Sequence, residues 1–326
     1  MLRQFSQPDG DWLSQDGWLW KSGGEQQSVD GKALKLRLTS TAFKDACETV
    51  LLRPRATRFA VCVSTQIGCG VGCRFCATGN MGFQRNLSSW EILEQFLRAG
   101  WAAAKYVQPS PGRLPPLRNV VFMGMGEPLH NASAVEQAIE LLSDPQWFGL
   151  SMRSITLSTA GVPAKMVAMA SRFPKLRIAL SLHSADHEKR RFLVPRAVAD
   201  LEVLRDAIRR INSIQNDTVW IEVALIDGIN DAAEDARMLI DFCRDLIVEV
   251  NVIPYNDTSH ASVGSGLHAT AGIMRAPTPE RVDAFIAKVR KAGIFTTHRK
   301  TLGESIQAAC GQLITPGLKP ELSTEA

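Results

Sequence analysis

Three cysteines in this 326-residue chain have a spacing that suits a metal cluster, Cys69-x-x-x-Cys73-x-x-Cys76. Thiolates are the usual ligands of iron–sulfur clusters, and a cubane has four irons, so three cysteines leave one iron for a ligand that is not a side chain. Such an open iron can bind and reductively cleave S-adenosylmethionine. Zinc binding or ordinary thiol packing are the alternatives, but zinc knuckles usually add a second cysteine pair or a nearby histidine, and neither lies close to the motif. The spacing therefore predicts a [4Fe-4S] cluster.

A glycine-rich turn, Gly124-Met125-Gly126-Glu127-Pro128, follows the second expected strand of the main sheet. Glycines let the backbone approach a ligand, and a carboxylate can accept hydrogen bonds from an ammonium such as that of a methionyl group. Turns of this composition also serve only to reverse the chain. The position of this turn, one strand after the cysteine loop, favours a ligand site.

Four polar side chains follow other expected strands: Ser158, Ser181, His183 and Asn256. Each suits ribose hydroxyls or a carboxylate, although any single one of them could simply cap a helix or brace a turn. The carboxyl ends of parallel strands meet at one mouth, so together they favour a bound ligand.

Short β-rich runs alternate with amphipathic helical windows, which predicts βα units and a parallel sheet. The expected strands are Phe59 to Ser64, Asn119 to Met123, Ser154 to Ser158, Leu176 to Leu182, Val219 to Ile226 and Glu249 to Pro254. The expected helices are Ser88 to Ala103, Ala134 to Ser143, Pro163 to Ser171, Asp200 to Ile214, Ala232 to Leu246 and Pro279 to Ala292, with Ser88 and Thr278 as caps. Six units are too few to close an eight-stranded barrel but enough for an open one.

The fold expected is therefore α/β, a partial (β/α)6 TIM-like barrel with a small N-terminal β extension. Three regions follow from this reading: the β extension over residues 1–58, the barrel over 59–293 and a C-terminal segment over 294–326. A hairpin turn is expected at Asp30-Gly31.

Composition narrows the class of protein. The chain has 45% hydrophobic residues, and neither a long apolar run nor an N-terminal signal core, so we expect a cytoplasmic protein without a membrane segment. Seven cysteines, an odd number, then suit a reducing compartment, as ligands or catalysts. The net charge of +4 permits a polyanionic partner without requiring one, and the basic group Lys189-Arg190-Arg191 also suits a solvated helix face.

These motifs resemble the RlmN/Cfr family of radical S-adenosylmethionine RNA methyltransferases. The resemblance runs from about Asp30 to Leu313 and includes the cluster motif, the glycine-rich turn, and Ala308-Ala309-Cys310-Gly311-Gln312-Leu313 with its partner Cys62. The cluster motif alone indicates the superfamily, whereas the Cys310 segment together with Cys62 indicates the family. The stretch before Cys62 is shorter than in typical members, so we expect the N-terminal helical accessory domain to be missing.

The resemblance implies a reaction that uses two S-adenosylmethionine molecules per turnover. One methylates Cys310; the second is cleaved at the cluster, and its 5′-deoxyadenosyl radical takes a hydrogen from the S-methyl group. The resulting carbon radical adds to adenine carbon 2 in 23S rRNA, with tRNA as a further candidate substrate. Glu48 matches the family's base for the ring proton. Cys62 then attacks the Cys310 sulfur, and the transient Cys62–Cys310 disulfide releases the base.

The resemblance also implies a set of S-adenosylmethionine contacts and other partners. The expected contacts are Gly126, Glu127, Ser158, Ser181, Leu182, His183 and Asn256, with Leu182 contributing its backbone only. An electron donor such as flavodoxin or ferredoxin is expected, and the protein is expected to be a monomer.

Three alternatives stay open at the level of sequence. The first is Cfr-like methylation of adenine carbon 8, since no residue separates the two products. The second is radical methylation of another RNA. The third, from a different class, is a zinc-stabilised nucleic-acid-binding protein without turnover.

Overall fold

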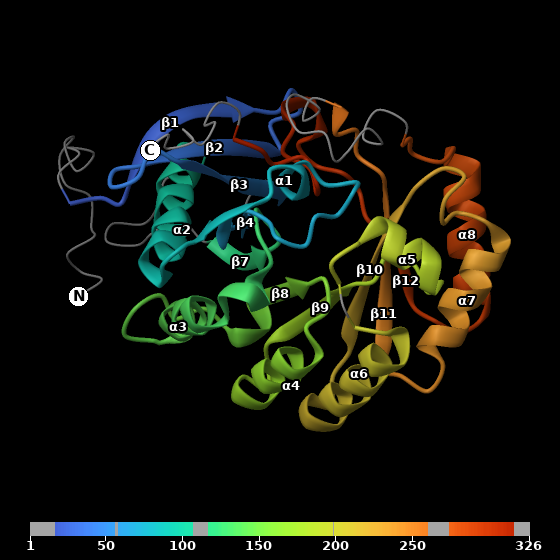
Figure 1. Ribbon diagram of the computed structural model, residues 1–326. Coiled ribbons are helices and arrows are strands. Elements are labelled where there is room, and N and C mark those ends of the chain that lie inside the picture. The colour runs from blue at the N-terminus through green and yellow to red at the C-terminus, as the bar shows by residue number, and fades with distance from the viewer. Residues whose placement is uncertain (1–16, 56–57, 107–116, 198, 260–273, 316–326) are drawn as a thin grey trace, which may run out of the picture.

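The computed structural model describes residues 17–55, 58–106, 117–197, 199–259 and 274–315, and its centre is one curved sheet (Figure 1). The strands follow the order β1-β2-β3-β4-β7-β8-β9-β10-β11-β12. From β4 onward every neighbouring pair is parallel, whereas β1 to β4 pair in antiparallel fashion. The predicted α/β fold, an open parallel barrel with an added β region, is confirmed. The ends of the first and third predicted regions, residues 1–16 and 316–326, lie outside the described residues.

The six predicted parallel strands all form. They are β4 (Arg58–Cys62), β7 (Leu117–Phe122), β8 (Ile155–Thr159), β9 (Arg177–Ser181), β10 (Val219–Leu225) and β11 (Val248–Pro254). One further parallel strand, β12 (Thr296–His298), pairs with β11 and was not predicted, because three residues of mixed polarity give no detectable period.

Amphipathic helices cover the outer side of the sheet (Figure 1). They are α2 (Ser89–Ala104), α3 (Ala132–Ser143), α4 (Pro163–Arg172), α6 (Leu201–Gln215), α7 (Ala233–Cys243) and α8 (Pro279–Lys291). In α6 the buried face contains Leu204, Ile208 and Ile211, which recur at helical spacing. Truncating one such side chain to alanine should cost about 2–5 kcal/mol of stability. A short helix, α5 (His187–Leu193), was not predicted; its N-cap Asp186 accepts from the Lys189 N–H at 2.9 Å.

The two predicted caps differ in outcome. Ser88 forms a full capping box with α2: its hydroxyl accepts from the Glu91 N–H at 3.2 Å, and Glu91 Oε2 accepts from the Ser88 N–H at 2.8 Å. Thr278 occupies the N-cap position of α8, but its side chain makes no capping hydrogen bond.

The N-terminal β region continues the barrel sheet. Its strands are β1 (Trp20–Gln27), β2 (Ala33–Ser40) and β3 (Ala46–Arg55), with the predicted turn at Asp30-Gly31 between the first two. Trp20 is fully buried and donates its indole N–H to the Glu91 carbonyl at 2.9 Å, which ties this region to α2. Because β3 pairs with β4, residues of the β region lie directly beside Cys62.

The cysteine loop and the C-terminal segment meet at the carboxyl ends of the parallel strands. The loop lies between β5 (Gln66–Gly68) and β6 (Phe83–Asn86), which form a separate two-stranded sheet, and it includes the short helix α1 (Ala77–Asn80). Ala77 N–H donates to the Gly311 carbonyl at 2.7 Å, and Thr78 Oγ1 donates to the Leu313 carbonyl at 2.6 Å. Segments far apart in sequence therefore share this end of the barrel. Within the described part of the chain, no helix is long and apolar enough to cross a membrane.

Candidate active site

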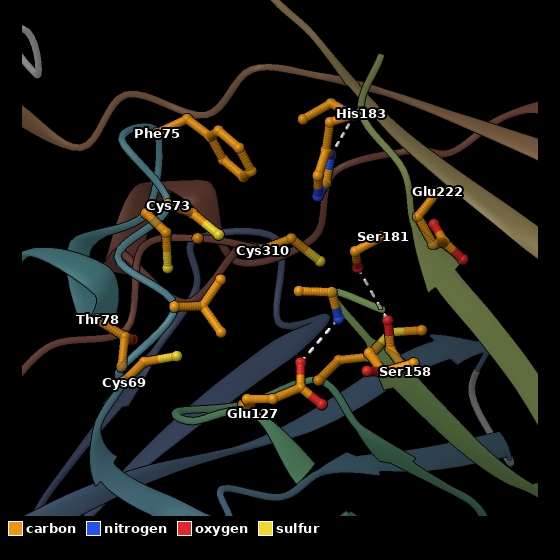
Figure 2. A pocket seen from close by; sticks show the side chains of 18 of the residues that line it. Cys69, Cys73, Phe75, Thr78, Glu127, Ser158, Ser181, His183, Glu222 and Cys310 are labelled. Atoms are coloured by element: carbon orange, nitrogen blue, oxygen red, sulfur yellow. Dashed lines mark hydrogen bonds between the residues drawn. The ribbon is translucent and has the colours of Figure 1, made fainter. Parts of the chain in front are cut away.

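A pocket opens at the carboxyl ends of the parallel strands. Its volume, including the open solvent at its mouth, is about 890 Å³. Figure 2 shows Cys69 and Cys73 on one side of it, with Ser158, Ser181 and His183 on the other. Cys76, Gly124, Gly126, Glu127 and Cys310 also line it. The structure thus gathers most of the residues predicted from sequence around one hollow.

Backbone geometry shapes the cysteine loop. Gly68 has φ +70°, and a Cβ there would lie 1.7 Å from the Gly82 carbonyl oxygen, so only glycine fits. The Cys69 N–H donates to that same oxygen at 2.9 Å. A Cβ at Gly79 would lie 2.8 Å from the Cys73 carbonyl oxygen. The glycines therefore allow the loop to fold tightly enough to present its thiols inward.

The three loop thiols fit an iron–sulfur cluster. Burial raises the pKa of Cys69 to about 12. Burial, and then the thiols of Cys76 and Cys69, raise the pKa of Cys73. Burial also raises the pKa of Cys76, and hydrogen bonds from Gly79 and Thr78 oppose that rise. Buried thiols of this kind stay protonated at neutral pH unless a metal centre binds the thiolate. Among the described residues, no three Cys, His, Asp or Glu side chains converge as ligands of a single metal ion. All three thiols line the same pocket, and in a cubane each cysteine binds a different iron.

Glu127 is buried and held in place by the backbone. Its Oε1 accepts from the Leu129 N–H at 2.9 Å, and its Oε2 accepts from the Ala160 N–H at 2.7 Å. Burial raises the pKa of Glu127, and these hydrogen bonds partly oppose the rise. A carboxylate has about four acceptor positions, so Glu127 can still accept from a ligand ammonium at the pocket wall.

The glycines beside Glu127 are required by protein packing. A Cβ at Gly124 would lie 2.6 Å from the Val63 carbonyl oxygen, and one at Gly126, which has φ +101°, would lie 2.6 Å from Gln66 Cβ. Sequence reasoning assigned these glycines to close approach of a ligand. In the structure they make room for the backbone at Val63 and for Gln66.

Ser158 and Ser181 lie on the adjacent strands β8 and β9 at the pocket, and their hydroxyl oxygens are 3.2 Å apart.

His183, two residues after Ser181, has a backbone in the left-handed region, with φ +61°. Its Nδ1 accepts from the Ala224 N–H at 3.1 Å, and burial together with Arg190 lowers its pKa to about 3. The ring is therefore neutral and its proton lies on Nε2. It stacks at a tilt against Phe75, at a 4.5 Å centroid distance.

Arg190 braces the same strand ends from within. It is buried, and it donates to the carbonyls of Ser181, Leu182 and Ala160. Burial lowers its pKa to about 10, so it remains a cation at neutral pH. The idea that the basic group 189–191 lies on a solvated face is therefore wrong for Arg190.

Two predicted contact residues lie outside the pocket lining. The Leu182 N–H donates to the Glu222 carbonyl at 3.1 Å, and its carbonyl accepts from Arg190. Asn256 donates from Nδ2 to the Cys310 carbonyl at 2.9 Å and accepts from Thr301 Oγ1 at 3.2 Å. The contacts that the structure shows for Asn256 are therefore to the C-terminal segment.

The two cysteines that are expected to take part in methyl transfer differ in exposure. Cys310 is exposed and lines the pocket, whereas Cys62 is buried on β4; both are free thiols. Burial first, and then Cys310, raise the pKa of Cys62 to about 12, while Arg299 and the Met123 N–H oppose the rise.

Sequence reasoning missed two charged residues in the pocket. Arg299 is the one Lys or Arg among the described residues that line it, and its Nη1 lies 3.5 Å from Glu222 Oε2. Cys310, Glu222 and Cys62 all raise the pKa of Arg299, although burial opposes them. A charged residue within the apolar run Val219 to Ile226 was the available signal for Glu222.

Glu48, the predicted base, is buried on β3 and does not line the pocket. Its Oε1 lies 3.1 Å from Lys35 Nζ, and its Oε2 accepts from the Ile314 N–H at 3.0 Å. Burial raises the pKa of Glu48, and Lys35 is the largest opposing influence.

The sequence and the fold are similar to those of known proteins. A family model for the radical SAM superfamily matches residues 63–243. The chain is 46% identical over 287 residues to a probable RNA methyltransferase of Rhodopirellula baltica, covering 88% of this chain and 71% of the relative. It is 40% identical over 288 residues to a probable dual-specificity RNA methyltransferase RlmN of Moorella thermoacetica, covering 88% and 77%. The crystal structure of a radical SAM methyltransferase from Sphaerobacter thermophilus superposes with a TM-score of 0.81 at 35% identity, covering 90% and 81%.

Proposed function

The chain belongs to the radical SAM superfamily and, within it, to the RlmN type of RNA methyltransferases, and from this we propose that it methylates adenine carbon 2 in 23S rRNA through a methyl group carried on Cys310. It is a SAM-dependent radical enzyme whose cofactors are a [4Fe-4S] cluster and S-adenosylmethionine. A tRNA is proposed as a second substrate, because relatives in this family are named dual-specificity enzymes.

One observation supports the proposal above the others: Cys310 lines the same pocket as the three cluster thiols. A methyl group on its sulfur would therefore lie within the hollow where the radical forms. The exposure of Cys310 also suits it to accept that methyl group from a first S-adenosylmethionine.

In the proposed site, Cys69, Cys73 and Cys76 hold the cluster, and Glu127, Ser158, Ser181 and His183 surround S-adenosylmethionine. When bound, these cofactors supply the radical that removes a hydrogen atom from the Cys310 methyl group. A neutral His183 suits a ligand wall because it offers an Nε2–H donor without adding charge. We further propose that Gly126, Leu182 and Asn256 contribute contacts.

The residues of β3 and β4 would complete the reaction. Glu48 would accept the ring proton, and the unpaired electron of the adduct would pass back to the cluster. Cys62 would attack the Cys310 sulfur as a thiolate, so that an S–S bond forms while the bond between that sulfur and the transferred carbon breaks. The carbon would leave with the bonding electron pair and take up a proton to become the methyl group, and a reductant would then restore both thiols. The raised pKa of Cys62 makes this last displacement sensitive to nearby cations.

The test is to incubate anaerobically reconstituted protein with labelled S-adenosylmethionine and unmodified rRNA. Label should appear first on Cys310, by peptide mass spectrometry, and then on carbon 2 of an adenosine, by nucleoside analysis. Label on carbon 8 instead would replace the proposed product. Methylation of RNA by Cys310→Ala would refute the carrier role, whereas loss of RNA label in that variant with cluster content unchanged would support it.

A further inference from the structure

A buried ion pair lies beneath the segment that carries Cys310. Lys35 Nζ and Glu48 Oε1 are 3.1 Å apart, and their side chains are 7% and 4% exposed. They come from neighbouring strands: Lys35 faces Val50 in the register of β2 and β3, and Glu48 faces Arg37, so the pair is diagonal on one face of the sheet. Burying two charges is costly, which makes such a pair unusual without a role.

Both partners of the pair also bind the C-terminal segment. Lys35 Nζ donates to the Gln307 carbonyl at 3.4 Å, before Cys310 in sequence. The Ile314 N–H donates to Glu48 Oε2 at 3.0 Å, after Cys310. One ion pair therefore anchors both ends of the stretch 307–314.

Residues other than the ion pair hold the middle of the stretch 307–314. Asn256 Nδ2 donates to the Cys310 carbonyl, and the Ala77 N–H donates to the Gly311 carbonyl at 2.7 Å. Thr78 Oγ1 binds the Leu313 carbonyl. These contacts fix the middle and the later part of the stretch against the cysteine loop, while the ion pair fixes its ends against the β region.

We infer that Lys35 is a positioning residue which, with Glu48, clamps the segment 307–314 so that Cys310 stays in the pocket during methyl transfer. This inference rests on the proposed role of Cys310 as the methyl carrier. Lys35 touches neither the pocket nor a proposed ligand and acts through Glu48 and the segment.

The clamp also links the protonation state of the proposed base to the hold on the segment that carries Cys310. The charged groups facing Glu48 are Lys35 and Arg37, both of which favour its ionised form against burial. When Glu48 takes the ring proton it becomes neutral, and its attraction for Lys35 falls. Proton uptake then loosens the clamp at the stage when the Cys310 sulfur must be reached by Cys62.

Hydrogen exchange of the anaerobic, cluster-loaded protein tests the clamp independently of methylation. In Lys35→Met, peptides covering 307–314 should exchange about tenfold faster than in the unchanged protein. Lys35→Arg should restore slow exchange. The matched control is Lys32→Met, on the same strand hairpin, whose exposed lysine pairs with Asp30 at 3.5 Å. Glu48→Gln, which mimics the protonated carboxyl, should exchange as fast as Lys35→Met.

Slow exchange of 307–314 in Lys35→Met, equal to that of Lys32→Met, would overturn the clamp. If Lys35→Met is too unstable to purify, the double variant Lys35→Met/Glu48→Met replaces it, because it removes both buried charges. Segment 307–314 should exchange fast in this variant as well. Slow exchange would again contradict the inference. Mass analysis of the peptide that contains Cys310 distinguishes failure of the clamp from failure of the proposed function. If the clamp exists but Cys310 is not the methyl carrier, Lys35→Met exchanges fast and no variant shows an added methyl mass on Cys310.

Discussion

The guanidinium of Arg299 pairs with Glu222 at the edge of the pocket, with Nη1 and Oε2 3.5 Å apart, and its charge acts on both Cys62 and Cys310. The same Nη1 lies 3.6 Å from Met123 Sδ, and the Met123 N–H points at the Cys62 thiol. The backbone of Arg299 is fixed because its N–H donates to the Val252 carbonyl at 2.9 Å. The short strand β12 thus delivers a cation to the two thiols that the proposed reaction joins.

Replacing Arg299 with methionine should slow the release of product. Without the guanidinium, less Cys62 is present as thiolate, and its attack on the Cys310 sulfur should be about tenfold slower. A covalent protein–RNA adduct should accumulate, as seen on a denaturing gel. Arg299→Lys should recover part of the rate.

Glu222→Gln is the informative partner of that variant. It leaves the cation in place but removes the carboxylate that partly neutralises it, so release should be unchanged or faster. Slow release in Glu222→Gln as well would mean that the pair acts only by supporting the pocket wall.

Alkylation should distinguish the two thiols in the resting protein. Cys310 is exposed, whereas Cys62 is buried with a pKa of about 12, so at pH 7 only about one Cys62 in 10⁵ is thiolate. Brief iodoacetamide treatment followed by peptide mapping should label Cys310 first, with Cys62 unlabelled. Raising the pH from 7 to 9 should accelerate labelling of Cys62 by roughly a hundredfold, because its thiolate fraction rises about tenfold per pH unit below its pKa. Equal labelling at pH 7 would contradict the burial of Cys62.

Much of this site could be predicted from sequence because its residues follow strand ends. Hydrophobic alternation located the strands that end near Ser158 and Ser181, and parallel packing brings such ends together. The roles of Lys35 and Arg299 could not be predicted in this way. Lys35 reaches the C-terminal segment across 272 residues of chain, and a β2 lysine has the same local pattern whether it faces solvent or a buried carboxylate.

The glycine-rich turn shows a related limit. Sequence reasoning assigned Gly124 and Gly126 to the close approach of a ligand and gave no packing reason for them. The distances to Val63 and Gln66 supply that reason.

Gly124→Ala should therefore destabilise the protein even without ligand. The added Cβ would lie 2.6 Å from the Val63 carbonyl oxygen, a backbone atom that cannot move without disturbing β4, and we expect a loss of about 1–3 kcal/mol. Urea unfolding of the reduced apoprotein measures it. Gly70→Ala is the control, because its Cβ would meet its nearest atom at an ordinary 3.6 Å. Equal stability of the two variants would show that the turn has room for a side chain.

His183 should make stability depend on acid. Burial, and then Arg190, lower its pKa from 6.5 to about 3, so between these values the unfolded chain binds a proton that the folded chain does not. Stability therefore falls as pH drops below 6.5, by up to about 1.4 kcal/mol per pH unit from this group, and is fully present above 6.5. Urea unfolding at pH 7 and pH 5 should show a smaller drop for His183→Asn, which tolerates the left-handed backbone at φ +61°. His298→Asn, at a side chain 44% exposed, should retain the full drop. An equal drop in both variants would show that the buried imidazole is not the source, because His183 combines a buried ring, a neighbouring cation and an Nδ1 that already accepts from the Ala224 N–H.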